Sequence, residues 1–110
     1  MTFRYHGKEF RLFTGFYPNG WPVLSLESPE NGELYTVLTV NPEDSPAFGI
    51  PDQAFIDINN NPEAMEFLRR NSLAEDTGYS RKSRWVEYPM ARLNLAEPYR
   101  LSPESFENKE

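Results

Sequence analysis

The sequence predicts an α+β fold in which a twisted antiparallel sheet, a meander of about five or six strands, carries one α-helix on a face. Two observations predict this architecture. Apolar and aromatic residues alternate with polar ones over most of the chain, and short segments rich in Gly, Pro and Asn interrupt them. One stretch alone, residues 53–73, has a helical period. With 110 residues, 38% of them hydrophobic and 15% aromatic, the chain can build one core.

Four strands are expected in the first 40 residues. They are Thr2–Tyr5, Glu9–Tyr17, Trp21–Ser28 and Glu33–Val40, the last being rich in β-branched and aromatic residues. The turns between them, at His6-Gly7, Pro18-Asn19-Gly20 and residues 28–32, are too short for crossover connections. Consecutive strands are therefore expected to pair antiparallel.

A loop, a short strand and the helix follow. Asn41–Asp52 contains three prolines and has no period, so we expect a loop there. Ala54–Ile58 is expected to be a short strand or an extended entry into the helix. The helix is expected over Pro62–Asn71 with Asn61 as its N-cap, because asparagine is a favoured cap and proline a favoured first helical residue.

The last third of the chain is expected to complete the sheet. Leu73–Lys82 is polar and contains a turn signal, whereas Ser83–Leu95 predicts one or two strands with Pro89 at an edge or a bend. We assign residues 1–95 to a single α+β domain and expect residues 96–110 to be a flexible acidic tail. The predicted core consists of Phe10, Leu12, Leu24, Leu26, Val37, Leu38, Phe55, Ile56, Met65, Leu68, Val86 and Leu93.

Charge is distributed unevenly along the chain. The formal net charge is −6, but residues 1–68 carry a net −7 and residues 69–100, with seven basic and four acidic side chains, carry +3. Bulk acidity disfavours general nucleic-acid binding, which needs a clustered cationic face. The chain has no cysteine, no signal-like apolar run near its start and no stretch near the roughly 20 apolar residues of a membrane span. We therefore expect a cytoplasmic protein.

Few residues point to catalysis or to a bound cofactor. His6, the one histidine, and Glu87 are the acid–base candidates, and ordinary surface roles are favoured for both. Asp57, Asn59 and Asn61 alternate as calcium ligands do, but the central glycine and distal glutamate of a calcium loop are missing. We expect no catalytic residue, no cofactor and no metal site, and therefore a protein that is not an enzyme.

Two surfaces are candidates for binding. The first is acidic and suits a basic groove on a protein; its residues are Glu27, Glu30, Glu33, Glu43 and Asp44. The second interleaves basic and aromatic side chains, which can hold phosphates and stack on bases; its residues are Tyr79, Arg81, Lys82, Arg84, Trp85 and Arg92. We favour the acidic surface and a protein partner, with direct nucleic-acid binding as the alternative.

Three segments resemble an uncharacterised family of small proteins. They are TFRYHGKEFRL, AFIDINNNPEAMEFLRRNSLAEDTG and YPMARLNL, and the resemblance extends over about Met1–Leu95. Members of that family are found on mobile elements, plasmids and prophages of gut Firmicutes. The resemblance implies an interaction protein of a mobile element, with an anti-CRISPR-like inhibitor of a host nuclease or other nucleic-acid-handling protein as the sharper hypothesis. A small nucleic-acid-binding accessory module is the alternative.

Overall fold

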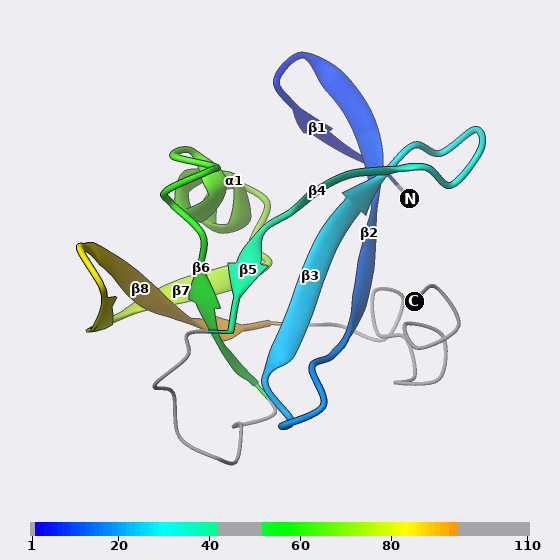
Figure 1. The fold of residues 1–110 in the computed structure, drawn as a ribbon. Helices are drawn as coiled ribbons and strands as arrows, with labels where there is room; N and C mark the ends of the chain where they lie inside the picture. Colours follow the sequence, from blue (N-terminus) through cyan, green and yellow to red (C-terminus); the bar gives the residue numbers. More distant parts are fainter. Residues whose placement is uncertain (1, 42–51, 95–110) are drawn as a thin grey trace.

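The structure is a computed structural model that describes residues 2–41 and 52–94. These residues form eight strands and one helix, and the strands make two four-stranded antiparallel sheets (Figure 1). The predicted α+β class is confirmed, whereas the prediction of one meander of five or six strands is wrong. Most of the predicted loop and the whole predicted tail lie outside the described residues.

The first sheet is a meander, as predicted for this part of the chain. Its strands pair in chain order and are β1 (Phe3–Tyr5), β2 (Lys8–Phe16), β3 (Pro22–Glu27) and β4 (Leu34–Val37). The β1–β2 turn has a positive φ at both central residues, 50° at His6 and 78° at Gly7. This conformation matches the right-handed twist of a two-residue hairpin.

The second sheet contains the strands that follow residue 38. They are β5 (Thr39–Val40), β6 (Gln53–Ile56), β7 (Ala74–Ser83) and β8 (Val86–Leu93), in the spatial order β5-β6-β8-β7. β7 corrects the prediction of a polar connection over Leu73–Lys82. Most of its side chains are exposed, so it lacks the alternation that identifies a half-buried strand. Pairing with β8 holds β7 in the sheet, with an irregular register between Asp76 and Ser80.

Leu38 joins the two sheets and explains why the single predicted strand over Glu33–Val40 divides. Its N–H donates to the carbonyl oxygen of Leu24 in the first sheet (2.8 Å), and its carbonyl oxygen accepts from the N–H of Asp57 beside the second (2.9 Å). The side chain is fully buried. Both halves of the run have a strand-like sequence, so periodicity alone cannot show the change of sheet.

Pro89 lies within β8, which is an inner strand of the second sheet. It is paired with Ser80 of β7 and comes one residue before Met90, where the pairing of β8 with β6 ends. Among the described strands, β8 therefore has only β7 beside it at this point. Proline, which has no backbone N–H, is tolerated at such a position. This agrees with the expectation that Pro89 lies at an edge or a bend.

The helix α1 (Ala64–Arg70) is shorter than predicted, and Asn61 does not cap it. Glu63 occupies the N-cap position and makes no side-chain capping hydrogen bond, so the capping prediction is wrong. Three buried side chains hold the helix against the core instead, namely Ala64, Phe67 and Leu68. The short helix thus depends on tertiary packing more than on its own end.

The main core lies between the two sheets and α1. Nine of the twelve predicted core residues are buried, and the other three, Val37, Met65 and Val86, are partly exposed. A second, smaller cluster contains Trp21, Phe55 and Met90, and we call it the Trp21 cluster. Trp21 and Phe55 pack with ring centroids 5.1 Å apart. The Trp21 cluster supports the surface beside the β7–β8 hairpin.

Candidate functional site: a groove beside the β7–β8 hairpin

The β7–β8 hairpin extends away from the first sheet, with its yellow tip at the left of Figure 1. Ser83 and Val86 are the last pair, and Arg84 and Trp85 form the turn between them. Arg84 has a φ of 59°, and the side chain of Trp85 is 87% exposed. Because a large apolar ring is exposed where a small polar turn residue would suffice, the tip is a candidate contact surface.

An open groove of about 660 Å³ lies next to this turn, and we call it the hairpin groove. One wall comes from the hairpin and contains Arg84, Trp85, Val86 and Tyr88; the other contains Tyr17, Val40 and Asn59. Tyr17, Val40 and Tyr88 also pack against the Trp21 cluster, so a packed core supports the floor. Among the described residues that line the groove, arginine is the one charged type.

Tyr17 is fixed in the wall of the groove. Its hydroxyl donates to the backbone carbonyl oxygen of Thr39 at 3.3 Å. Burial raises the pKa of Tyr17, a side-chain hydrogen bond with Thr39 lowers it, and the nearby carboxylate of Asp57 raises it further. The ring therefore stays neutral at physiological pH and offers the groove an apolar face.

The basic–aromatic residues predicted from the sequence gather on this hairpin, with one exception. Arg81 pairs with Tyr88 and Lys82 with Glu87 across the strands, and Tyr79 is 54% exposed. Arg92 lies nearer the base of the hairpin, where its guanidinium contacts the carboxylate of Glu75 at 3.0 Å. The hairpin thus holds Tyr79, Arg81, Lys82, Arg84 and Trp85 on one element and Arg92 apart from the tip.

Three of the acidic residues predicted as an interaction surface lie in the described structure, at the end of β3 and in the connection that follows it. Glu30 and Glu33 are exposed in the connection between β3 and β4. Glu27 is 3% exposed at the end of β3, which corrects the expectation that it faces a partner. Glu43 and Asp44 lie outside the described residues. The described part of this surface is therefore limited to two carboxylates.

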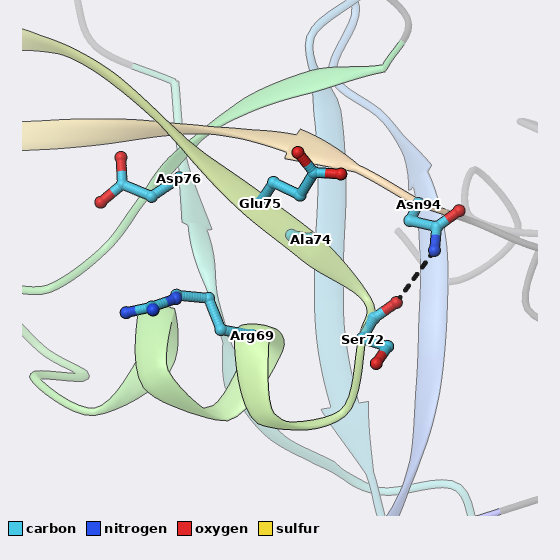
Figure 2. A pocket seen from close by; sticks show the side chains of 6 residues that line it. All are labelled: Arg69, Ser72, Ala74, Glu75, Asp76 and Asn94. Carbon is cyan, nitrogen blue, oxygen red and sulfur yellow. Dashed lines mark hydrogen bonds between the residues drawn. The ribbon is translucent and has the colours of Figure 1, made fainter.

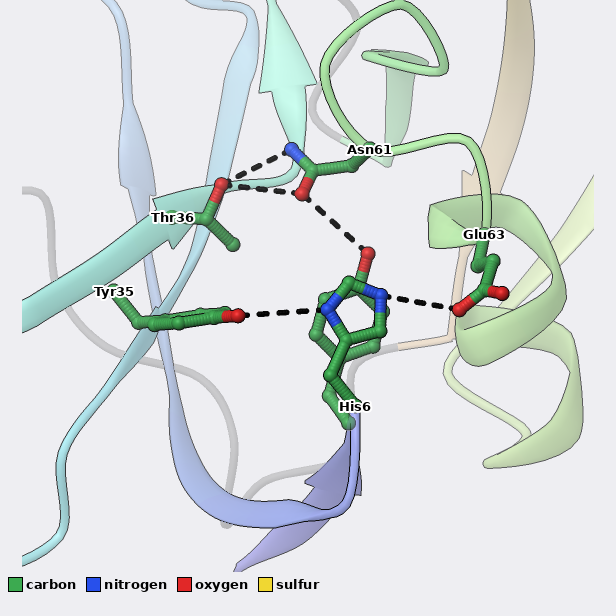
Figure 3. A network of polar contacts seen from close by, with 6 residues as sticks. His6, Tyr35, Thr36, Asn61 and Glu63 are labelled. Atoms are coloured by element: carbon green, nitrogen blue, oxygen red, sulfur yellow. Dashed lines mark hydrogen bonds and ion pairs between the residues drawn. The ribbon is translucent and has the colours of Figure 1, made fainter.

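His6 belongs to a polar network at the side of the first sheet (Figure 3). Its Nε2 lies 3.1 Å from Oε1 of Glu63 and its Nδ1 lies 3.4 Å from the hydroxyl oxygen of Tyr35. The Tyr5 ring stacks on the imidazole at 4.0 Å. The network links the β1–β2 turn, β4 and the start of α1, and His6 does not line the hairpin groove. We assign His6 a structural role.

Asn61 is buried in the same network. Its amide nitrogen donates to Oγ1 of Thr36 and to the carbonyl oxygen of Val37, both at 3.0 Å. Its amide oxygen accepts from the hydroxyl groups of Thr36 (3.2 Å) and Tyr5 (3.4 Å). Asn61, which resembles a helix cap in the sequence, therefore links the segment before α1 to the first sheet.

The two remaining chemical candidates also have structural partners. Glu87 accepts a short hydrogen bond from the hydroxyl of Ser80 across the hairpin. Asp57 accepts from the backbone N–H (3.1 Å) and the side-chain amide (3.0 Å) of Asn60, which is an ordinary turn interaction. Within residues 2–41 and 52–94, no cluster of three or more His, Asp or Glu side chains could hold a metal ion.

A second open groove, of about 600 Å³, lies between α1 and β7 (Figure 2). Arg69 of the helix and Glu75 and Asp76 of β7 line it. Asn94 donates to the carbonyl oxygen of Ser72 at 3.2 Å and closes one end. Exposed charges of both signs line this groove, and Glu75 is already engaged by Arg92, so its chemistry is less distinctive than that of the hairpin groove.

Sequence reasoning singles out the basic–aromatic residues but misses both the hairpin that carries them and the groove beside it. Tyr17, Val40 and Tyr88 have the pattern of ordinary strand residues, and no spacing along the chain connects them. Trp85 gives no clear signal either, because it falls within the strand expected over Ser83–Leu95. The residues that stand beside it are brought there by the fold.

The fold and the groove together define a class of protein: an α+β domain of two antiparallel sheets with an aromatic surface groove. The chain belongs to the DUF4313 family, a domain of unknown function, whose family model matches residues 16–110. This confirms the expectation of an uncharacterised family. Neither the curated proteins nor the solved structures include a match to this chain.

The family match has a simple relation to the structure. It begins at the last residue of β2, so it includes all of the hairpin groove, whereas His6 lies before it. No helix in the described ranges has the length and apolarity needed to cross a membrane.

Proposed function

We propose that this chain is a non-enzymatic binding protein that holds a protein partner at the β7–β8 hairpin. The observation that carries the proposal is Trp85, an 87% exposed tryptophan beside a groove with tyrosine in both walls. Tryptophan, tyrosine and arginine are the residues most enriched among those that dominate binding energy at protein interfaces. All three types occur together here on one supported hairpin.

Carboxylates on the hairpin favour a protein partner over nucleic acid. Glu87 lies opposite Lys82 in the strand pairing, and Glu75 is bound to Arg92. A phosphate backbone that extends along the hairpin beyond the groove would meet these negative charges together with the net charge of −6. Exposed aromatic rings serve either partner, so the charge pattern decides between them.

The narrower hypothesis is an anti-defence inhibitor of a mobile element that blocks a nucleic-acid-handling host protein. The family resemblance and the exposed Glu30 and Glu33 support it, since carboxylates can occupy a basic groove. The buried Glu27 reduces the acidic surface on which that hypothesis first rested. The hairpin is the better supported contact element, and cytoplasmic location is part of the same proposal.

Affinity capture from nuclease-treated host lysate tests the proposal with two matched variants. Trp85→Ala should lose the captured protein, whereas Leu34→Ala, which removes an apolar side chain that is 60% exposed on β4, should keep it. Both sites are exposed, so both variants should unfold within about 0.5 kcal/mol of wild type. The captured protein must then bind the purified chain directly and protect Trp85 from a fluorescence quencher.

Two results would overturn the proposal. One is a partner that binds Trp85→Ala as tightly as wild type. The other is a salt-sensitive mobility shift of DNA or RNA by the purified chain that Trp85→Ala abolishes. That second result would establish the nucleic-acid-binding alternative on the same hairpin.

A further inference from the structure

The hairpin groove also indicates what kind of segment its partner presents. We infer that the groove takes an extended acidic peptide segment in which an aromatic side chain lies between Asp or Glu residues. This inference rests on the proposed function, because it names the chemical class of the partner at the same site. Three features of the groove lead to it.

The first feature is the shape and apolarity of the groove. Its volume of about 660 Å³ lies within the range of sites that take a small molecule or a few side chains. Tyr17 and Tyr88 supply ring faces, and Val40 and Val86 supply aliphatic surface. A planar aromatic side chain fills such a space best, because it gains area at a small entropic cost and packs against other rings.

The second feature is the sign of the charge around the groove. Arg84 lines it from the turn, and Arg81 of β7 lies opposite Tyr88, another residue that lines it. Among the described residues that line the groove, none is acidic, and Glu87 points to the face of the hairpin that carries Lys82. Charge complementarity therefore selects carboxylates beside the aromatic anchor and disfavours lysine or arginine there.

The third feature is the rigidity of the site. Tyr17 is bonded to Thr39, and the tyrosines rest on the buried Trp21, Phe55 and Met90. A supported floor lets a peptide bind without ordering the walls first, which reduces the entropic cost of association. Trp85 completes the site from the turn, where it can close against an aromatic ring of the peptide.

The two tryptophans allow a direct measurement on the unmodified protein. Trp21 is 2% exposed and Trp85 is 87% exposed, so acrylamide quenching of the fluorescence reports mainly on Trp85. Peptides without tryptophan are titrated, each with two glycines at either end. Their central sequences are Asp-Glu-Phe-Glu-Asp, Asp-Glu-Ala-Glu-Asp and Lys-Lys-Phe-Lys-Lys. Trp85→Phe supplies the signal that comes from Trp21 alone.

The acidic phenylalanine peptide should protect Trp85 saturably. The peptide without the aromatic ring and the basic peptide should each bind at least about tenfold more weakly, since each loses one of the two complementary interactions. Arg84→Glu should weaken the acidic peptide by about tenfold or more and should improve the basic one. Leu34→Ala should leave the dissociation constants of all three peptides unchanged, because Leu34 lies on β4 of the other sheet.

Several outcomes would overturn the inference. Equal binding of the alanine peptide would reduce the site to a charged patch, and stronger binding of the basic peptide would reverse the predicted sign. Protection that appears on concentrating the protein alone would assign the groove to a second copy, and protection by a dT20 oligonucleotide would assign it to nucleic acid. If no peptide protects Trp85 while a captured protein still requires it, this inference fails and the proposed function stands.

Discussion

Asn61 provides the sharpest test of how this chain is held together, because two physical accounts predict different results for one substitution. As a helix cap, asparagine is interchangeable with aspartate. As the centre of a buried network, it must donate from its amide nitrogen to Thr36 and Val37, which aspartate cannot do. Asn61 is 5% exposed, so water cannot easily replace the lost partner.

The expected loss of stability follows from the hydrogen bonds that Asn61 makes. Asn61→Asp keeps an acceptor for the Tyr5 hydroxyl but places carboxylate oxygens against the carbonyl oxygen of Val37. A buried polar group left without its partner costs about 1–3 kcal/mol, so we expect Asn61→Asp to lose at least about 2 kcal/mol of the free energy of unfolding. Asn61→Ala should lose about 3 kcal/mol, because the Tyr5 hydroxyl and Val37 carbonyl both lose this partner.

Urea unfolding followed by circular dichroism measures these losses. Asn59→Ala is the matched control, since Asn59 is an exposed asparagine two residues earlier and should change the free energy by less than about 0.5 kcal/mol. In a domain of this size, each kcal/mol of lost stability lowers Tm by about 4–8 °C. Asn61→Asp should therefore lower Tm by roughly 8–16 °C. Wild-type stability of Asn61→Asp would refute the network account and restore the capping one.

Three further predictions concern the join between the sheets, the hairpin turn and the response to alkali. Leu38→Ala should lower the free energy of unfolding by about 2–5 kcal/mol in urea melts, because the side chain is fully buried where the backbone bonds to both sheets; a loss below about 1 kcal/mol would contradict this assignment. Arg84→Gly should raise the free energy of unfolding by up to about 1 kcal/mol, because a φ of 59° is strained for arginine and not for glycine; a lower Tm in thermal melts would show that the interactions of the Arg84 side chain outweigh this strain. Burial raises the pKa of Tyr17 above its ordinary value of 10.0, so above that pH the unfolded chain releases its proton first and stability falls as pH rises. Tyr17→Phe should make the free energy of unfolding, measured between about pH 9 and 11, less dependent on pH; an unchanged slope would show that Tyr17 does not contribute.

Local sequence features predict those parts of the fold whose cause is local. Alternation locates β1 and β2, because a half-buried strand has a period of two. β3 is buried along its whole length, and the turns on either side locate it. The same reasoning misses β7, whose exposed side chains carry no such period. Periodic apolar residues locate the helix but not its first residue, because a buried asparagine and a capping one have the same sequence signal.

For the candidate site, the sequence shows which residue types are present, whereas the packing of the strands determines how those residues are arranged. The linear chain already shows an acidic protein without cysteine and a basic–aromatic run that ends in Trp85. Whether Glu27 faces water or the interior, and whether Tyr17 stands beside Tyr88, depends on which strands become neighbours. Which strands become neighbours depends on burial of the whole core between the two sheets, to both of which Leu38 is hydrogen-bonded. No short stretch of the sequence determines this pairing.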